Sequence, residues 1–344
     1  TTLQVPFLAD LVTGADPTSP LSFLAYVKSI GRLYQFAVRE SAFVTRDQYN
    51  RYCQWVADRL PSLAFGTRVE RVSFDEGAGV YRLDVAAGEH RSVVSARNVV
   101  VGVGTTPELP RVVPAPPPRG VTHSATYLDD RDALLRARSV LLVGSGQSAA
   151  EIFYDLLCRK PDELYLAWIT RAERFAPMDD SKLALELASP DYVAHFQRLP
   201  GAARKRLLAG QDSLYRGINR ELLARIYDAL HDRTVAGPRS DVSLTPGVEL
   251  VGVESTGRGL AVELAARDVG RRVRRRFDRV VCATGYGYRF PRCLAPIDPR
   301  LERDEVGALR LRPDGSVRGT APGVYVHNAE PLAQGFTASD LSLG

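Results

Sequence analysis

Two glycines one residue apart, Gly144 and Gly146, lie where a short apolar run meets an amphipathic segment. Glycine permits a tight turn and lets the backbone approach a pyrophosphate closely, and the first N–H groups of a following helix would attract that anion. A glycine pair alone is weak evidence, but a strand before it and a helix after it are the context that such a motif needs. The spacing therefore predicts a dinucleotide-binding turn formed by Gly144, Gly146, Gln147 and Ser148.

The next apolar run, residues 164–170, ends at Arg171. An acid at the end of the second strand of a dinucleotide-binding domain binds the ribose 2′-hydroxyl of NAD, whereas an arginine there favours the 2′-phosphate of NADP. We therefore interpret Arg171 as a candidate for NADPH selection. The alternative is an ordinary surface arginine.

Two further apolar strands end in glycine on either side of this unit, within residues 97–107 and 277–286. In each, a run of β-branched residues stops where the chain would return between two domains. Two such crossings between domains, one on either side of a dinucleotide-binding turn, are typical of a flavoprotein that binds two dinucleotides. Two ordinary parallel strands would also fit. Thr284, Gly285 and Tyr286, at the end of the second strand, are candidates for cofactor binding.

The 344 residues include 45 basic and 40 acidic side chains, and this length is enough for two or three domains. The arginine cluster at 271–276 could bind a polyanion, but we interpret it as a solvated turn and edge strand, because no aromatic residues alternate with it as in a nucleic-acid platform. No apolar run is long enough to span a membrane, and no signal peptide opens the chain. We expect neither a nucleic-acid nor a membrane partner.

The four cysteines form no CxxC pair and have no histidine at metal-ligand spacing, so we expect no metal site. Cys158 lies in a predicted helix and Cys282 in an apolar strand, and both are expected to be buried small hydrophobic residues. Free thiols fit a reducing compartment, which favours a cytoplasmic location.

The order of the local patterns predicts alternating helical and β segments. Tyrosines and apolar residues at helical spacing indicate helices, and apolar alternation around glycine turns indicates hairpins. We expect helices at 22–31 and 46–60, a mainly helical stretch at 178–234, hairpins at 63–86 and 248–264, a proline-rich linker at 107–118 and a last strand at 324–329.

Several blocks occur in the same order as in the flavin-dependent N-hydroxylating monooxygenases of siderophore biosynthesis, which act on ornithine, lysine or a diamine. They are LQVPFLADLV with ADPTSPLSFLAYV, RxxYxxYCQWVA, GVGTTPELP, GSGQSAAEIF, ATGY, and HNA with QGF and LS near the end. The chain resembles this family, in its lysine/diamine branch, over essentially all of its length.

The resemblance implies an α/β fold with two Rossmann-like dinucleotide-binding domains. We expect an FAD domain at 1–138 and 277–344, an NADPH domain at 139–175 and 235–276, and a small helical substrate segment at 176–234. In the family, a strand–GxGxxN–helix unit that holds the FAD pyrophosphate would precede Thr1, and it is absent from this sequence. The family also continues beyond Gly344, so we expect this chain to bind FAD poorly.

The resemblance also implies a reaction. NADPH reduces FAD, the flavin reacts with O₂ to give a C4a-hydroperoxide, and a neutral amine attacks the distal oxygen. Gln4 matches a family glutamine beside the flavin ring and is the candidate catalytic residue and a cofactor contact, the alternative being a polar loop residue. Ser342, in the closing motif, is a further candidate cofactor contact. The partners implied are a small amine and O₂, in a homotetramer or homodimer.

Two positions bear on which amine is used. Family ornithine hydroxylases carry a lysine five residues after the glutamine and an asparagine in a DDSxxxNE block, where this sequence has Ala9 and Leu185. Burying a carboxylate without a partner is costly, so we expect a diamine such as putrescine or cadaverine. Asp340 and Glu186 are candidates to bind its distal ammonium, with a surface or helix-cap acid as the alternative for each, and Asn328 is assigned to the same site.

Three other functions remain open at this point. One is an L-lysine N6-monooxygenase. A second is another flavin or disulfide oxidoreductase of the same layout, although the disulfide type would need a CxxC pair that the sequence lacks. The third is a truncated, flavin-free homologue with a binding role.

Overall fold

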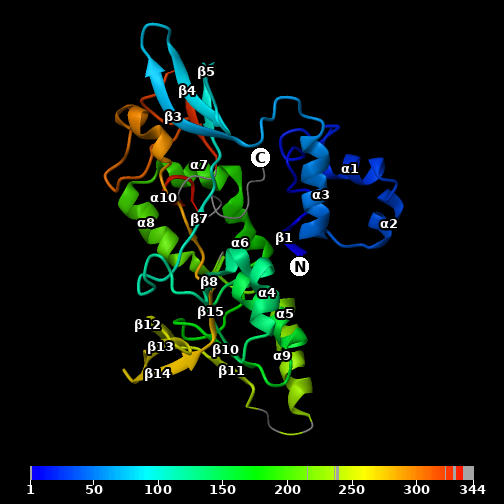
Figure 1. Ribbon diagram of the computed structural model, residues 1–344. Coiled ribbons are helices and arrows are strands. Elements are labelled where there is room, and N and C mark those ends of the chain that lie inside the picture. Colours follow the sequence, from blue (N-terminus) through cyan, green and yellow to red (C-terminus); the bar gives the residue numbers. More distant parts are fainter. Residues whose placement is uncertain are drawn as a thin grey trace. The chain divides into compact units, whose positions relative to one another are not determined.

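The computed structural model consists of two compact units (Figure 1). Unit 1 comprises Thr1–Gly104, Leu185–Gly210 and Phe290–Gly344, and unit 2 comprises Thr105–Ala184 and Gln211–Arg289. The residues that the structure describes are 2–214, 216–235, 237, 240–321, 323–327 and 331–335.

Unit 2 is built on a five-stranded sheet in the order β11-β10-β9-β15-β8, in which every neighbouring pair is parallel. Val143 at the end of β9 lies in register with Ile169 of β10 and with Cys282 of β15, so the carboxyl ends of these strands form one edge. The strands are β8 (Val121–His123), β9 (Ser139–Val143), β10 (Tyr165–Ile169), β11 (Val242–Thr245) and β15 (Arg279–Cys282).

Alternating apolar residues give this sheet two buried faces, because successive side chains of a strand point to opposite sides. Leu142 and Trp168 pack in a core with α4 (Tyr127–Leu135), α5 (Gln147–Arg159) and α9 (Arg220–Thr234). Leu141 and Ile169 pack in a second core, against an antiparallel sheet. Figure 1 shows the parallel strands between these two layers. The strands of the antiparallel sheet are β12 (Val248–Thr256), β13 (Gly259–Ala266) and β14 (Arg272–Phe277).

Unit 1 contains the parallel pair β6–β17 and the antiparallel sheet β3-β4-β5. Their shared core includes Val72, Tyr81, Val99 and Val324. The remaining elements of this part are β3 (Thr67–Asp75), β4 (Val80–Ala87), β5 (His90–Ala96), β6 (Val99–Val101), η4 (Arg292–Arg300), β17 (Val324–Val326), α7 (Pro190–Arg198), α8 (Gly201–Gly210) and α10 (Pro331–Gln334).

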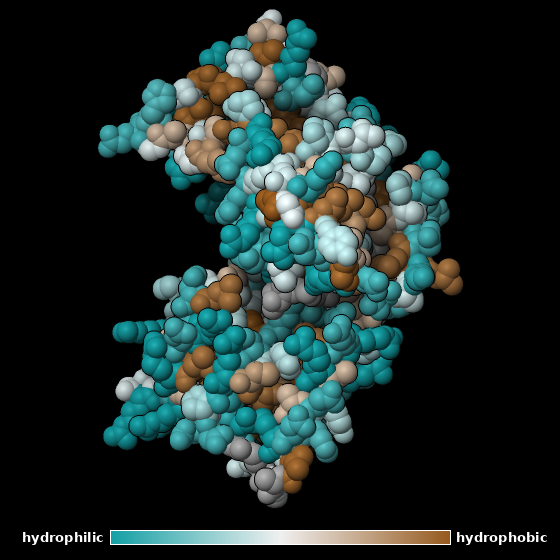
Figure 2. Space-filling model, turned by 90° about the vertical axis from the view of Figure 1, so that its right-hand side faces the viewer, coloured by the Kyte–Doolittle hydropathy of each residue, from teal (hydrophilic) through white to brown (hydrophobic). Residues whose placement is uncertain are grey.

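The N-terminal segment of unit 1 has its own aromatic core, in which the ring of Phe23 packs against Tyr52 at 5.3 Å and Phe36 at 5.6 Å. It contains β1 (Thr2–Pro6), α1 (Phe23–Ser29), α2 (Leu33–Val38), β2 (Phe43–Thr45) and α3 (Arg46–Ala57). Figure 2, viewed from the side of α1 and α2, shows apolar residues among polar ones on this face. We call the following exposed residues the N-terminal apolar face: Leu24, Ile30, Leu33, Tyr34, Val38 and Phe43.

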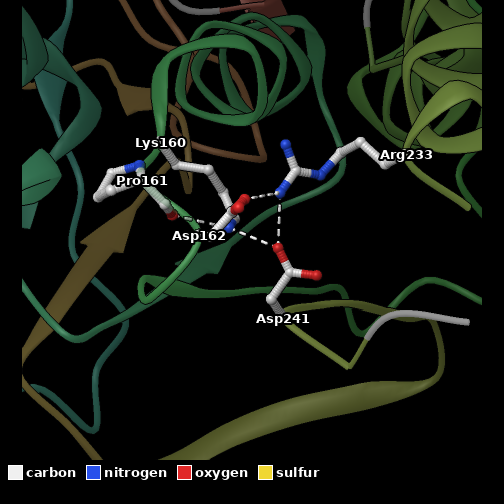
Figure 3. Close-up of polar contacts among 5 residues, drawn as sticks. All are labelled: Lys160, Pro161, Asp162, Arg233 and Asp241. Atoms are coloured by element: carbon white, nitrogen blue, oxygen red, sulfur yellow. Dashed lines mark hydrogen bonds and ion pairs between the residues drawn. The ribbon is translucent and has the colours of Figure 1, made fainter. Parts of the chain in front are cut away.

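A buried ion cluster joins three elements of unit 2 where α5 and α9 end and β11 begins (Figure 3). Lys160, the residue after α5, has a fully buried side chain, and its Nζ lies 2.6 Å from Oδ2 of Asp241. Arg233 of α9 donates to the same oxygen at 2.6 Å, and the Lys160 ammonium also donates to the carbonyl of Pro161 at 3.1 Å. Arg233 also lies 3.5 Å from the exposed carboxylate of Asp162, so Asp241 is the carboxylate that the two cations share.

The structure confirms the helices predicted at 22–31 and 46–60 and both predicted hairpins. The helical stretch at 178–234 is divided into α6 (Lys182–Leu185), η2 (Glu186–Ala188), α7, α8, η3 (Asp212–Leu214) and α9. The prediction for Cys158 is wrong, because this thiol is exposed on the solvent side of α5, whereas Cys282 is buried as expected. In the described residues, no helix is long and apolar enough to cross a membrane, and no cluster of side chains could hold a metal ion.

The boundaries of the compact units differ from the predicted domain boundaries. β8 and β15 were expected in the FAD domain, yet both belong to the sheet of unit 2. The predicted substrate segment at 176–234 is shared between the units, with 185–210 in unit 1. The chain first enters unit 2 after Gly104 and finally leaves it after Arg289. Both points lie near the two glycine-ended strands, where the sequence predicts that the chain crosses between domains. The difference arises because β15 is distant from β9 in the sequence and pairs with it only in the folded sheet, where β8 in turn pairs with β15.

Candidate functional site: a glycine turn at the carboxyl edge of the parallel sheet

The turn between β9 and α5 is shaped by a close backbone approach. Gly144 has a φ of +142°, and a Cβ added to it would lie 2.2 Å from the carbonyl oxygen of Ala283, the residue after β15. No other residue type fits here, because an L side chain both clashes and is strained at this φ. The two sequence blocks GSGQS and ATGY therefore meet at one edge of the sheet.

Trp168 fixes this turn from the side of β10. Its side chain is buried, and its Nε1 donates a hydrogen bond of 2.7 Å to the carbonyl oxygen of Gly144. Its ring packs against Phe153 at 4.7 Å and Phe175 at 4.2 Å. The sequence analysis did not single out Trp168, since a tryptophan in an apolar strand indicates only core packing.

The start of α5 is open to a ligand. Gly146 is the N-cap residue, no side chain caps the helix, and an added Cβ at Gly146 would have no atom within 4 Å. Ser148, in the first turn, is exposed. Free N–H groups at the start of a thirteen-residue helix suit an anion.

Gln147 makes contacts within the protein. Its Oε1 accepts a hydrogen bond from the backbone N–H of Asn219 at 2.8 Å, and its Nε2 donates to Glu151 at 3.1 Å. Asn219 in turn caps α9 through the N–H groups of Glu221 and Leu222. Gln147 thus joins the starts of α5 and α9, a positioning role that sequence reasoning did not assign to it.

Arg171 lies two residues beyond β10 and is exposed. Its carbonyl accepts a hydrogen bond of 3.1 Å from Arg267, and in the described part of the chain its guanidinium has no ion-pair partner. Thr170, before it, is buried and holds the N–H of Ala172 through its hydroxyl. A guanidinium in this place is available to an anionic group at the same edge of the sheet.

The ATGY block is held by side chains and backbone from two other segments. The hydroxyl of Thr284 donates to the carbonyl of Glu108 at 2.5 Å, and Gly285 has a φ of +87°. Tyr286 is half-exposed and opens β16 (Tyr286–Gly287), which pairs with β7 (Thr106–Pro107).

His123, at the carboxyl end of β8, was not anticipated. Its Nδ1 accepts from the N–H of Ala125 at 3.1 Å, so Nε2 carries the hydrogen and donates to the carbonyl of Gly285 at 2.9 Å. Burial lowers the pKa of this imidazole, which favours the neutral form that can accept at Nδ1. The ring of His123 also meets the ring of Tyr286 edge-on at 5.2 Å.

The candidate residues near the N-terminus lie in and after β1. The backbone of Gln4 belongs to β1, and its side chain is outside the described part of the chain. Ala9 is half-buried, and its N–H donates to the carbonyl of Pro6 at 2.9 Å. Asp10 follows it, and its carboxylate accepts from the N–H groups of Val12, Thr13 and Phe23 and from the Thr13 hydroxyl. Burial alone would raise the pKa of Asp10, but these hydrogen bonds outweigh it and lower the pKa.

The DDS block lies at a turn of unit 2, where the N–H of Asp179 donates to the carbonyl of Ser213 at 2.9 Å. Leu185 ends α6 and is 44% exposed, and Glu186 begins η2 and is exposed. In the residues that the structure describes, Glu186 forms no ion pair. Asn328, Asp340 and Ser342 lie outside the described residues.

The residues present fit the two cofactors implied by the sequence. The glycine turn has room for a phosphate group of NADPH, because no atom lies within 4 Å of a Cβ added to Gly146 and no side chain caps the start of α5. For FAD, Gly102 and Gly104 follow β6, and no atom lies within 4 Å of a Cβ added to either. Ligands of α/β sheets bind beyond the carboxyl ends of the strands, which is where both glycine pairs lie.

Comparison with known proteins agrees with this geometry. The model of the L-lysine 6-monooxygenase/L-ornithine 5-monooxygenase family matches residues 1–288. Putrescine N-hydroxylase of Shewanella oneidensis is 39% identical over 351 residues, covering 99% of this chain and 69% of that protein. DfoA of Erwinia amylovora, a cadaverine monooxygenase of the desferrioxamine pathway solved with FAD, has a TM-score of 0.94 and 39% identity, covering 100% of this chain and 80% of that chain.

The ornithine N-hydroxylase of Kutzneria sp. 744, solved with reduced FAD, NADP+ and L-ornithine, has a TM-score of 0.91 and 26% identity, covering 100% of this chain and 84% of that chain. These similarities confirm the predicted α/β, Rossmann-like fold class. They extend over both compact units, because the matched regions span the whole chain. The chain belongs to the L-lysine 6-monooxygenase/L-ornithine 5-monooxygenase family of flavin-dependent N-monooxygenases.

Proposed function

We propose that this chain hydroxylates a primary amine of a diamine, putrescine or cadaverine, with FAD, NADPH and O₂, in the biosynthesis of a hydroxamate siderophore. Its similarity to a putrescine N-hydroxylase and to a cadaverine monooxygenase, each 39% identical, supports the substrate class. Bound FAD supplies the redox chemistry, in which one oxygen atom of O₂ goes to the amine and the other leaves as water. The protein binds and orients the reactants and excludes water.

The observation that carries the diamine assignment is the charge around position 9. Ala9 offers no cation to an amino-acid carboxylate, and the next residue, Asp10, is an acid whose hydrogen bonds keep it ionised. Leu185, where an asparagine would bind the same carboxylate, is apolar. An α-carboxylate held here would find no cation at Ala9 and no amide at Leu185, whereas a diamine has no such group.

The two units divide the cofactors between them in this proposal. Unit 2 binds NADPH, with its pyrophosphate at Gly144 and Gly146 and its 2′-phosphate at Arg171. Unit 1 binds FAD beyond the ends of β6 and β17, with Gln4 beside the flavin. Support comes from Gly146 at one edge, from Gly102 and Gly104 at the other, each with free space where a Cβ would stand, and from the guanidinium of Arg171, which forms no ion pair with any described residue.

The substrate is tested by measuring hydroxylamine product with putrescine, cadaverine, lysine and ornithine, in enzyme supplied with FAD and NADPH. We expect kcat/KM for a diamine to exceed that for ornithine by about tenfold or more, since an unpaired buried charge costs about 1–3 kcal/mol. Ala9→Lys should move preference toward the amino acids, and Ala9→Met, of similar length but neutral, should not. A preference of the unmodified enzyme for lysine or ornithine would overturn the assignment.

NADPH preference is tested at Arg171. Arg171→Ala should raise the KM for NADPH about tenfold while leaving the KM for NADH almost unchanged, because only NADPH carries the 2′-phosphate. Arg174→Ala is the matched control, as Arg174 is an exposed arginine three residues away. Equal effects of Arg171→Ala on both nucleotides would contradict this role.

We also propose that the enzyme is a cytoplasmic homo-oligomer, a dimer or tetramer, that buries the N-terminal apolar face. Tyr34 and Val38 lie four residues apart on α2, hence on one side of that helix, and are 77% and 61% exposed. Exposed apolar side chains that lie together are typical of a protein interface. Light scattering of the unmodified protein should give a molar mass that is a multiple of the chain mass. The double variant Tyr34→Asp, Val38→Asp should give a smaller molar mass. A monomer in the unmodified protein would refute the assembly.

A further inference from the structure

Unit 2 contains a polar pocket of about 380 Å³ that is open to solvent, which we call the amino-edge cavity. It is lined by the end of α4, by the turn between β12 and β13 and by the start of β15. Its charged residues are Arg136, Arg258, Arg279 and Asp278. This volume lies in the range of small-molecule sites.

The amino-edge cavity is separate from the glycine turn. Arg279 opens β15, whereas the glycine turn follows the carboxyl end of the neighbouring strand β9. Because the sheet is parallel, the two sites lie at opposite edges, roughly 13 Å apart for strands of four or five residues. A nucleotide bound at the glycine turn therefore does not account for the arginines of this cavity.

Within the residues that the structure describes, the three arginines have no acidic partner. In the described part of the chain none of them forms an ion pair, although Arg279 is half-buried. The one carboxylate of the cavity, Asp278, accepts a hydrogen bond from the backbone N–H of Arg138 at 2.8 Å. Other arginines of unit 2 do find acids, such as Arg159 with Asp155 at 2.8 Å. The cavity therefore carries an excess of two positive charges.

The end of α4 accounts for only part of this charge. Arg136 is the C-cap residue of α4, and the negative end of a helix dipole favours a cation there. Arg258 and Arg279 come from elements outside α4, so the dipole does not explain their convergence. Three guanidinium groups around one cavity repel one another unless an anion lies among them.

One wall of the cavity is glycine backbone. Gly259, which lines it, has a φ of +121°, and a Cβ there would lie 2.9 Å from the carbonyl oxygen of Phe277. This close approach of two backbone segments requires glycine and places the turn that carries Arg258 beside the start of β15.

We propose that the amino-edge cavity binds a small oxyanion with two or more negative charges, carried on phosphate or carboxylate groups. Guanidinium groups match such groups with paired, charge-assisted hydrogen bonds. The proposal is independent of the substrate and cofactor assignments above, because it concerns only binding at this edge.

The test is calorimetric titration of the purified chain with pyrophosphate and, separately, with citrate, at constant ionic strength and with NADP+ saturating. We expect one site per chain for at least one probe, and the better probe identifies phosphate or carboxylate as the source. Arg258→Gln and Arg279→Gln should each weaken binding about tenfold or more. The control is Arg276→Gln, which removes an exposed arginine of β14 outside the cavity and should leave the affinity unchanged.

Arg258 lies on an exposed turn, so its variant keeps the test valid if Arg279→Gln fails to fold. Three results would overturn the proposal. They are the absence of binding by both probes, equal loss of affinity in Arg276→Gln, and displacement of the probe by NADP+, which would place it at the glycine turn.

Discussion

Replacing Asp241 by asparagine removes the carboxylate that Lys160 and Arg233 share in the buried cluster of unit 2, where Arg233 keeps its longer contact with Asp162 (Figure 3). The Lys160 side chain is fully buried, and the carbonyl of Pro161 would be its remaining hydrogen-bond acceptor in the cluster. Removing one partner of a buried ion pair costs about 3–5 kcal/mol. Asp241 is itself 15% exposed, so water can partly replace it, and we expect a loss near the lower limit, about 3 kcal/mol of unfolding free energy.

The same cluster sets a pH dependence. Burial alone would raise the pKa of Asp241, but the hydrogen bonds from Lys160 and Arg233 outweigh it and hold the pKa well below its usual range. A carboxyl whose pKa is depressed in the folded state stabilises above its unfolded pKa of about 4, and this contribution is lost as the pH falls toward the folded value. The stability difference between the unmodified protein and Asp241→Asn should therefore narrow below about pH 4.

Urea unfolding followed by fluorescence measures this loss. The sequence has two tryptophans, one in each unit, so Trp55→Phe leaves Trp168 as the reporter of unit 2. Arg159→Met is the matched control, because its ion pair with Asp155 is exposed and such pairs contribute less than about 1 kcal/mol.

Adding Lys160→Met to Asp241→Asn should recover part of the loss, since no unpaired ammonium then remains buried. A cost for Asp241→Asn at pH 7 that is no larger than the cost of Arg159→Met would refute the reasoning.

Three other substitutions test the turn and the N-terminal loop. Gly144→Ala should weaken NADP+ binding by tenfold or more, because its Cβ would overlap the carbonyl of Ala283, and titration with NADP+ would show this. Trp168→Phe removes the hydrogen bond to the Gly144 carbonyl and part of a buried ring, and it should cost about 2 kcal/mol or more in urea unfolding. We expect roughly fivefold weaker NADP+ binding as well, and unchanged affinity would count against its positioning role. Asp10→Asn removes the ionised acceptor of the Phe23 N–H and should cost about 1–2 kcal/mol at pH 7. Because the folded pKa of Asp10 is lowered, this cost should shrink progressively as the pH falls below about 4, as measured by thermal unfolding across pH.

The strand–turn–helix at 139–159 could be predicted because all of its signals are local. An apolar run, a glycine pair and an amphipathic helix follow one another within a few residues. The two hairpins were equally visible, since alternation and glycine turns are also local patterns.

The contacts that hold the turn could not be predicted in the same way. Gln147 meets the N–H of Asn219, and Trp168 meets the carbonyl of Gly144, across distances in sequence that no local pattern spans. The placement of β8 in the parallel sheet depends on its pairing with β15, which is likewise a long-range contact. Cys158 was assigned to the core because the helix was recognised without knowing which face packs inward.

The contact between Gly144 and Ala283 also sets an order of events during synthesis. β9, α5 and β10 leave the ribosome early and can pair locally, but β15 is made much later and must insert beside β9 to complete the sheet. Closing so long a loop costs entropy before the new contacts repay it. The glycine turn between β9 and α5 is therefore incomplete on a nascent chain until β15 has emerged, and a ligand that needs the finished turn could stabilise the chain only after that point.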